Sequence, residues 1–425
     1  MNYEQQGSLI ARMTIALWQT RKTLTTLDLD LSNNVNAINL ADVLMLCTNL
    51  CKLSFTTAHA LTPLVGDFST MEQHAALIDL QIEAQDIIGQ DIGLMLQRCQ
   101  QLRRFIMYTC NQSVFDVISR YTPNLEVLGY NSYFITQQLH KREDQKTKGL
   151  KALYTNKYVP TVSIKSILPL IYKNKGSLVE LHTAISEVTE RELQEMYSTY
   201  PDFTLDKINK LTSWMPMGTQ QFMLRSIHDT TTLTDLTAVK VHDVNELVNT
   251  LINLSALSTL EISYVYSTTG RSSLIRLFKR YARVAEKSRS SLTFARFQHC
   301  DTISDDVLSS LASINTLHKV CLCGLQYVST DGINNMISKL SNQLSYLRLE
   351  EMESVTDNVI FWLGDLKKLN RIVLVNLPNV TDAGIYELLD KADTHILTKL
   401  VVESCPMITA ECIAYAKQKI IVEHL

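Results

Sequence analysis

A short leucine pattern, L-x-x-L-x-L, recurs along the chain and constrains its fold more than any other feature of the sequence. Successive copies lie 22 to 35 residues apart, which is the spacing of a leucine-rich repeat whose units each supply one strand and one helix. Units of this kind stack into a solenoid and touch only their neighbours. The copies begin at residues 24, 50, 77, 102, 125, 150, 178, 200, 233, 257, 292, 317, 344, 369 and 397.

The register of the pattern predicts which side chains are buried. In the unit that begins at Leu344, strand alternation sends the fourth and sixth positions into the core and the third, fifth and seventh onto the open face. The spacing then becomes helical: in the stretch from Thr356 to Leu363, Thr356 and Asp357 are expected to cap a helix with an apolar face.

These features predict an α/β fold, a leucine-rich-repeat solenoid of horseshoe form with a parallel sheet on its concave face and helices on its convex face. Right-handed connections are expected because crossovers within one sheet almost always have that hand. Three segments follow: residues 1–23 as a helix that is a partial repeat or cap, residues 24–408 as about 15 repeats, and residues 409–425 as a C-terminal cap. The register is least regular near residues 200–233. A longer, strongly basic helix is expected from Ser272 to about Lys287.

Charge and hydropathy exclude several classes of partner. A net charge of −3, with 20% charged residues, argues against a nucleic-acid-binding protein, which would carry a basic excess. No apolar run approaches the roughly 18 residues of a membrane span, and the N-terminal stretch lacks the features of a signal peptide. The sequence therefore predicts a cytoplasmic or nuclear protein that binds neither nucleic acid nor membrane.

The nine cysteines do not form the pattern of a disulfide framework or of a metal site. Cys110, Cys300 and Cys405 each fall three residues after the last core position of a strand, where a small apolar side chain fits, so we interpret them as structural. Cys321 and Cys323, with His299 nearby in the preceding repeat, fall short of the four ligands and wider cysteine spacing of structural zinc. The sequence predicts no metal.

Motifs for catalysis are missing from the sequence. It contains no G-x-x-x-x-G-K-[ST] loop, no H-E-x-x-H, no G-x-S-x-G and no set of kinase signatures. The expectation is a protein without catalytic residues or cofactors that is not an enzyme.

The open face is predicted to be electrically divided. Up to residue 262, open-face positions carry two basic against nine acidic residues, or 2 − 9 = −7, namely Lys52 and Arg104 against Asp28, Asp30, Asp79, Glu83, Glu180, Asp202, Asp206, Asp235 and Glu261. From residue 292 onward the balance is 5 − 2 = +3, from Arg296, Lys319, Arg348, Arg371 and Lys399 against Glu350 and Glu403.

The basic part of this face is the predicted partner-binding site. Arginine and aromatic side chains are enriched at binding surfaces, and arginine pairs bidentately with carboxylate and phosphate. We therefore expect a protein partner with an acidic or phosphorylated segment; a merely solvated basic surface is the alternative. The site comprises Phe294, Arg296, Lys319, Tyr346, Arg348, Arg371 and Lys399.

Two units carry a family resemblance. Leu292 to Asp305 and Leu397 to Thr409 follow L-x-x-L-x-L-x-x-C and then an apolar residue with Ser or Thr, with Cys300 and Cys405 at the cysteine position. This pattern resembles the cysteine-containing leucine-rich repeat, a ribonuclease-inhibitor-like solenoid found in F-box proteins and in the antagonist-of-mitotic-exit protein. The resemblance implies a substrate-recognition part of an SCF-type ubiquitin ligase, whose F-box would bind a Skp-type adaptor.

The chain departs from that family before Leu24, where no F-box-like sequence occurs and only one helix is expected. Either an upstream part has been lost or the protein works without the box, so a Skp-type adaptor is expected only if an F-box lies upstream. The first alternative predicts exposed apolar surface around Leu17, Trp18 and Leu27. Two other functions stay open, a regulator of a small GTPase similar to ribonuclease-inhibitor-like activating proteins and a purely structural signalling scaffold.

Overall fold

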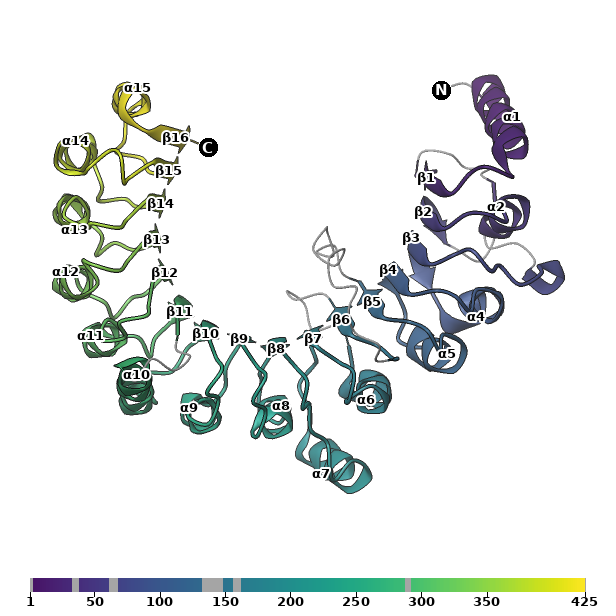
Figure 1. The fold of residues 1–425 in the computed structure, drawn as a ribbon, viewed down its shortest axis with the longest axis horizontal. Helices are drawn as coiled ribbons and strands as arrows, with labels where there is room; N and C mark the ends of the chain where they lie inside the picture. The colour runs from purple at the N-terminus through teal and green to yellow at the C-terminus, as the bar shows by residue number, and fades with distance from the viewer. Residues whose placement is uncertain are drawn as a thin grey trace. The chain divides into compact units, whose positions relative to one another are not determined.

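The computed structural model describes residues 3–32, 38–60, 68–131, 148–155, 162–286 and 292–424. The chain forms two compact units: Met1–Ser186 with Gln194–Ile208, and Glu187–Leu193 with Asn209–Leu425. Each unit is a stretch of leucine-rich-repeat solenoid, in which most described strands are followed by a helix and the strands pair in parallel (Figure 1).

Unit 1 contains strands β1 to β7, each paired in parallel with its neighbour in sequence. Its elements are α1 (Tyr3–Thr20), β1 (Thr26–Asp30), α2 (Leu40–Leu46), β2 (Lys52–Ala60), η1 (Phe68–Thr70), β3 (Asp79–Ile87), α4 (Gly89–Arg98), β4 (Arg104–Cys110), α5 (Val114–Tyr121), β5 (Val127–Tyr130), β6 (Ala152–Thr155), α6 (Ile164–Lys173) and β7 (Glu180–Thr183). Helix α7 (Glu190–Thr199) contributes residues to both units.

Unit 2 contains strands β8 to β16, again paired in parallel in sequence order. Its helices lie on one side of the sheet and leave the other face open (Figure 1). The elements are β8 (Lys210–Trp214), α8 (Thr219–Ile227), β9 (Asp235–Val239), α9 (Val244–Leu251), β10 (Thr259–Val265), α10 (Arg271–Glu286), β11 (Phe294–Cys300), α11 (Asp305–Leu311), β12 (Lys319–Cys323), α12 (Thr330–Lys339), β13 (Tyr346–Glu350), α13 (Asp357–Leu363), β14 (Arg371–Val375), α14 (Asp382–Lys391), β15 (Lys399–Glu403), α15 (Ala410–Lys419) and β16 (Ile421–His424).

The predicted register holds in all repeats but one. In β13, Leu347 and Leu349 are fully buried while Tyr346, Arg348 and Glu350 remain partly exposed, as alternation requires. The leucine-rich-repeat fold and its burial pattern are therefore confirmed.

The unit placed at residue 200 is wrong. Its strand, β8, begins at Lys210, so the true pattern starts at Ile208 with Leu211 and Ser213 at the core positions. The false match at Tyr200 arose because Phe203 and Leu205 are buried in an irregular segment. Asp202 and Asp206 consequently do not lie on a strand, which corrects the predicted open face.

An aspartate in the first turn of several helices fastens one repeat to the next. The carboxylate of Asp357 accepts two hydrogen bonds from Thr381, one from its backbone N–H at 2.7 Å and one from its side-chain hydroxyl at 2.7 Å. Asp305 does the same for Ser329, and Asp382 for Thr409. The sequence predicted that the aspartate caps its own helix, but its side chain instead accepts hydrogen bonds from the residue that caps the next one.

Two helical glycines leave room for these aspartates. A Cβ atom on Gly384 would lie 2.4 Å from an oxygen of Asp357, and one on Gly332 would lie 1.9 Å from an oxygen of Asp305. Both approaches are far inside van der Waals contact, so the aspartate and the glycine of the following helix form one packing unit. We call this pairing the inter-repeat latch.

The three cysteines interpreted as structural are buried. The thiol of Cys300 donates to the carbonyl of Ile262 in the preceding repeat at 3.3 Å, and Cys110 and Cys405 each donate to a carbonyl two residues earlier at 3.5 Å. These contacts confirm a packing role at the turn that leaves the strand.

Candidate partner-binding face

All seven residues of the predicted partner site lie on the open face of β11 to β15. Five of them follow one another across five adjacent strands in a single row of the sheet register, which we call the first row: Phe294, Lys319, Tyr346, Arg371 and Lys399. The structure therefore brings together, on one face, side chains that are 105 residues apart in the chain (399 − 294).

Arg296 and Arg348 lie in the second row, one on each side of Cys321. Neighbouring strands are about 4.8 Å apart, so the two arginine backbones are separated by roughly 10 Å. Cys321 between them is only 4% exposed, so the side chains around it cover this part of the second row.

Two of the five cations are neutralised within the protein. The Nε atom of Arg348 lies 2.8 Å from a carboxylate oxygen of Glu350, and Lys399 forms an ion pair with Glu423 on β16. Glu423 was absent from the predicted balance because residues 409–425 were treated as a cap and not as a further strand. Within the described residues, Lys319 and Arg371 have no ion-pair partner.

Tyr346 is held by the residues around it. Its ring packs against Val373, Val375 and Val401, which lie on the open face yet are 2 to 7% exposed. The guanidinium of Arg371 lies 5.6 Å from the ring centroid, in cation–π range. A tyrosine fixed in this way loses little conformational entropy when a partner binds.

Arg371 also has a buried donor without an acceptor. Its Nε atom is covered, and no hydrogen-bond partner for it occurs in the part of the chain that the structure describes. A buried unpaired donor costs about 1–3 kcal/mol.

The electrical division of the open face survives the register correction. Without Asp202 and Asp206, and with Lys210 added from β8, the balance up to residue 262 becomes 3 − 7 = −4. From residue 292 onward, Glu423 on β16 lowers the balance to 5 − 3 = +2. The open-face positions of the described residues are therefore net acidic up to residue 262 and net basic from residue 292 onward.

A second basic surface lies on the helix side of unit 2. The predicted long helix is confirmed as α10, and beside α9 it lines an open hollow of about 600 Å³. Arg276, Lys279, Arg280 and Arg283 line this hollow, and Arg276 donates to Asn249 at 3.1 Å. No aromatic side chain is among the described residues that line it.

The expectation for the N-terminal end is met only in part. Trp18 is 57% exposed and carries the guanidinium of Arg21 over its ring at 3.9 Å, whereas Leu17 is buried and Leu27 is half-buried. The prediction for Leu17 was wrong because this side chain lies on the inner face of α1.

No helix in the described residues is both long and apolar enough to cross a membrane.

No protein-family model matches the chain, and no curated protein matches its sequence. Among solved structures, the yeast complex of Rad7 and Elc1 contains a similar chain, with a TM-score of 0.51 and 14% identity over 99% of this chain and 94% of that one. The complex of TLR13 with the single-stranded RNA ssRNA13 gives a TM-score of 0.49 and 14% identity over 92% of this chain and 51% of that one. At such identities the likeness to Rad7 concerns the fold.

Proposed function

We propose that this protein is a non-enzymatic binding scaffold that captures an acidic or phosphorylated segment of a partner protein on the open face of β11 to β15. The observation that carries the proposal is the pair of rows in which two aromatic and five basic side chains lie together. A rigid tyrosine beside arginines that can each donate two hydrogen bonds to one anion is a typical binding hot spot.

Burial of the thiols supports a role without catalysis. Burial raises the pKa of Cys99, Cys300 and Cys323 to about 12, so these cysteines are protonated and weak nucleophiles at neutral pH.

We further propose that the scaffold serves as the substrate-recognition part of a ubiquitin ligase, either with an F-box supplied upstream or as a relative without the box. The repeat pattern around Cys300 and Cys405 supports this role. The likeness in fold to Rad7, which was crystallised with a protein partner, Elc1, agrees with it.

The binding proposal is tested with peptide arrays that differ only in charge. Immobilised peptides carrying acidic, phosphorylated, neutral or basic segments are probed with the full chain, and we expect retention by the acidic and phosphorylated sets only. Arg348→Ala and Tyr346→Ala should each weaken binding by about 1–2 kcal/mol without lowering the melting temperature by more than a few degrees.

Arg280→Ala is the matched control, because it removes an exposed arginine from the helix side of the same unit. Equal losses in Arg280→Ala and Arg348→Ala would mean that only net charge matters and would remove the open face as the site. Unchanged binding in the Tyr346→Ala, Arg348→Ala double variant would do the same.

The ligase proposal needs a separate measurement. The chain, alone and with its full upstream reading frame, is purified from its native cells and tested for co-purification of a Skp-type or Elc1-like adaptor. Recovery of either adaptor supports the ligase role, whereas recovery of neither leaves the scaffold without a ubiquitin link.

A further inference from the structure

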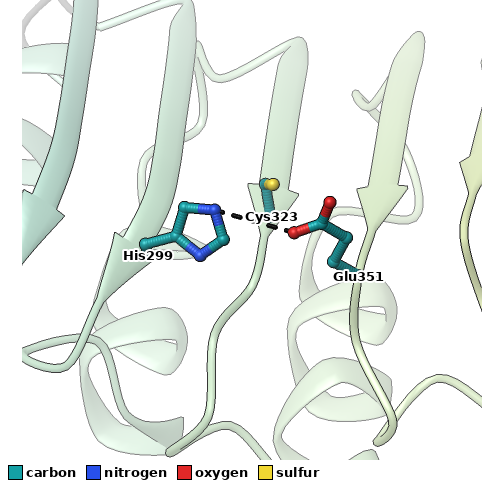
Figure 2. A group of neighbouring side chains, drawn as sticks. All are labelled: His299, Cys323 and Glu351. Carbon is teal, nitrogen blue, oxygen red and sulfur yellow. Dashed lines mark ion pairs between the residues drawn. The ribbon is translucent and has the colours of Figure 1, made fainter.

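Three side chains from successive repeats converge at one edge of the open face. His299 comes from the end of β11, Cys323 from the end of β12, and Glu351 directly follows β13 (Figure 2). Their ligand atoms all lie within 4.8 Å of one another, and the Nε2 atom of His299 is 3.6 Å from a carboxylate oxygen of Glu351. In the sequence, His299 stands out together with Cys321 and Cys323, whereas nothing marks Glu351 as the third member.

The backbone explains why His299 and Glu351 reach this place. Gln298 and Glu350 face the open side, so simple alternation would send the next residue of each strand into the core. His299 has φ 50° and Glu351 has φ 52°, the left-handed conformation, which interrupts the alternation. Both side chains stay on the solvent side, with 34% and 43% of the side chain exposed.

The intervening repeat is shaped to accept the histidine ring. Gly324 occupies the equivalent position after β12, and a Cβ atom there would lie 2.2 Å from the Nδ1 atom of His299. Any larger residue would therefore displace the ring. Tyr264, from the preceding repeat, stacks on the same ring with centroids 5.4 Å apart. Gly324 and Tyr264 thus fix the position of the His299 ring, and its Nε2 atom points toward Glu351 (Figure 2).

We propose that His299 Nε2, Cys323 Sγ and the carboxylate of Glu351 form a binding site for a borderline divalent cation, with Zn²⁺ as the favoured ion. One imidazole, one thiolate and one carboxylate are ligand types that zinc accepts together, and three protein ligands leave a fourth tetrahedral position for water. The Cys323 thiol is protonated in the metal-free chain, so binding of the cation displaces its proton to the solvent. The site uses none of the seven residues of the proposed partner face, although it lies on the same strands.

The geometry requires only a small adjustment. Zinc–ligand bonds of about 2.0–2.3 Å place tetrahedral ligand atoms roughly 3.5 Å apart, so the widest separation must shrink by roughly 1 Å. The partly exposed side chains of His299 and Glu351 can make this movement by rotation, while the buried Cys323 stays in place. Such a cation would join three consecutive repeats.

The first measurement uses the full chain, reduced and freed of metal by a chelator, in a Cys51→Ala background. Cys51 is the half-buried thiol among nine free cysteines, so its removal suppresses adventitious binding. Titration with Zn²⁺ against a chromophoric chelator should give one ion per chain. Co²⁺ should give a sulfur-to-cobalt charge-transfer band together with tetrahedral d–d bands.

The variants assign the ligands. Cys323→Ser should abolish the charge-transfer band, and His299→Ala and Glu351→Gln should each weaken Zn²⁺ binding by at least roughly 100-fold, since even supporting residues cost 10- to 100-fold. Gly324→Ala removes no ligand but displaces the ring, so it should also weaken binding by at least roughly 10-fold.

Cys321→Ser and His318→Ala are matched controls on the same strands or turns, outside the cluster, and should keep full affinity. Circular dichroism verifies the fold of every variant. The absence of stoichiometric Zn²⁺ binding to the folded chain would overturn the proposal. So would binding that persists in Cys323→Ser and His299→Ala, or is lost equally in the controls.

Discussion

At the scale of single residues, His74 shows how burial selects one protonation state. Its ring lies in unit 1, where Nδ1 accepts the backbone N–H of Leu77 at 3.2 Å and Nε2 faces the carbonyl of Cys47 at 3.1 Å. The neutral ring with its proton on Nε2 satisfies both contacts, whereas a second proton on Nδ1 would break the first. Burial lowers the pKa of His74 below 6.5.

This lowered pKa predicts a loss of stability in mild acid. The unfolded chain binds the proton more readily than the folded one, so the stabilisation is complete above pH 6.5 and is lost as the pH falls through the folded-state pKa. We expect the free energy of unfolding to decrease as the pH falls from about 7.5 to about 5, a window that reaches roughly one unit or more to either side of an ordinary histidine pKa. His74→Gln should flatten that slope. Urea unfolding at several pH values measures it. The exposed His395→Gln is the control, and an unchanged slope in His74→Gln would contradict the assignment.

At the scale of elements, the inter-repeat latch predicts opposite effects for two glycine substitutions. Gly384→Ala in α14 places a Cβ atom 2.4 Å from the carboxylate of Asp357 and should destabilise the protein by about 1–3 kcal/mol, because the hydrogen bonds to Thr381 are disturbed. Gly93→Ala in α4 meets its nearest atom at 3.7 Å and should stabilise by about 0.5–1 kcal/mol through helix propensity. Thermal unfolding followed by circular dichroism compares the two, and equal effects of the same sign would contradict the latch.

The elements also show what the sequence could predict. Strand positions depend on local alternation, so the periodic leucines were enough to predict the core positions of β13 and its neighbouring strands residue by residue. They failed at β8, where Ser213 occupies a core position and a better leucine match lay eight residues upstream (208 − 200). The latch of Asp357 and the placement of Glu351 beside His299 depend on contacts between repeats 24 residues or more apart, and no single repeat contains that information.

At the scale of the whole molecule, a solenoid transmits perturbations mainly to neighbouring repeats, because each repeat packs only on the next. Leu347 is fully buried in β13, so Leu347→Ala should create a cavity that costs about 2–5 kcal/mol. We expect hydrogen–deuterium exchange to increase in α12, α13 and β12 to β14, with β2 to β4 in unit 1 unchanged. The conservative Leu347→Met variant should leave the whole exchange pattern close to that of the unmodified chain, since a volume-conserving change costs less than about 1.5 kcal/mol. Loss of protection throughout both units in Leu347→Ala would instead show that they unfold as one cooperative body, and stability arguments made for one repeat would then apply to all.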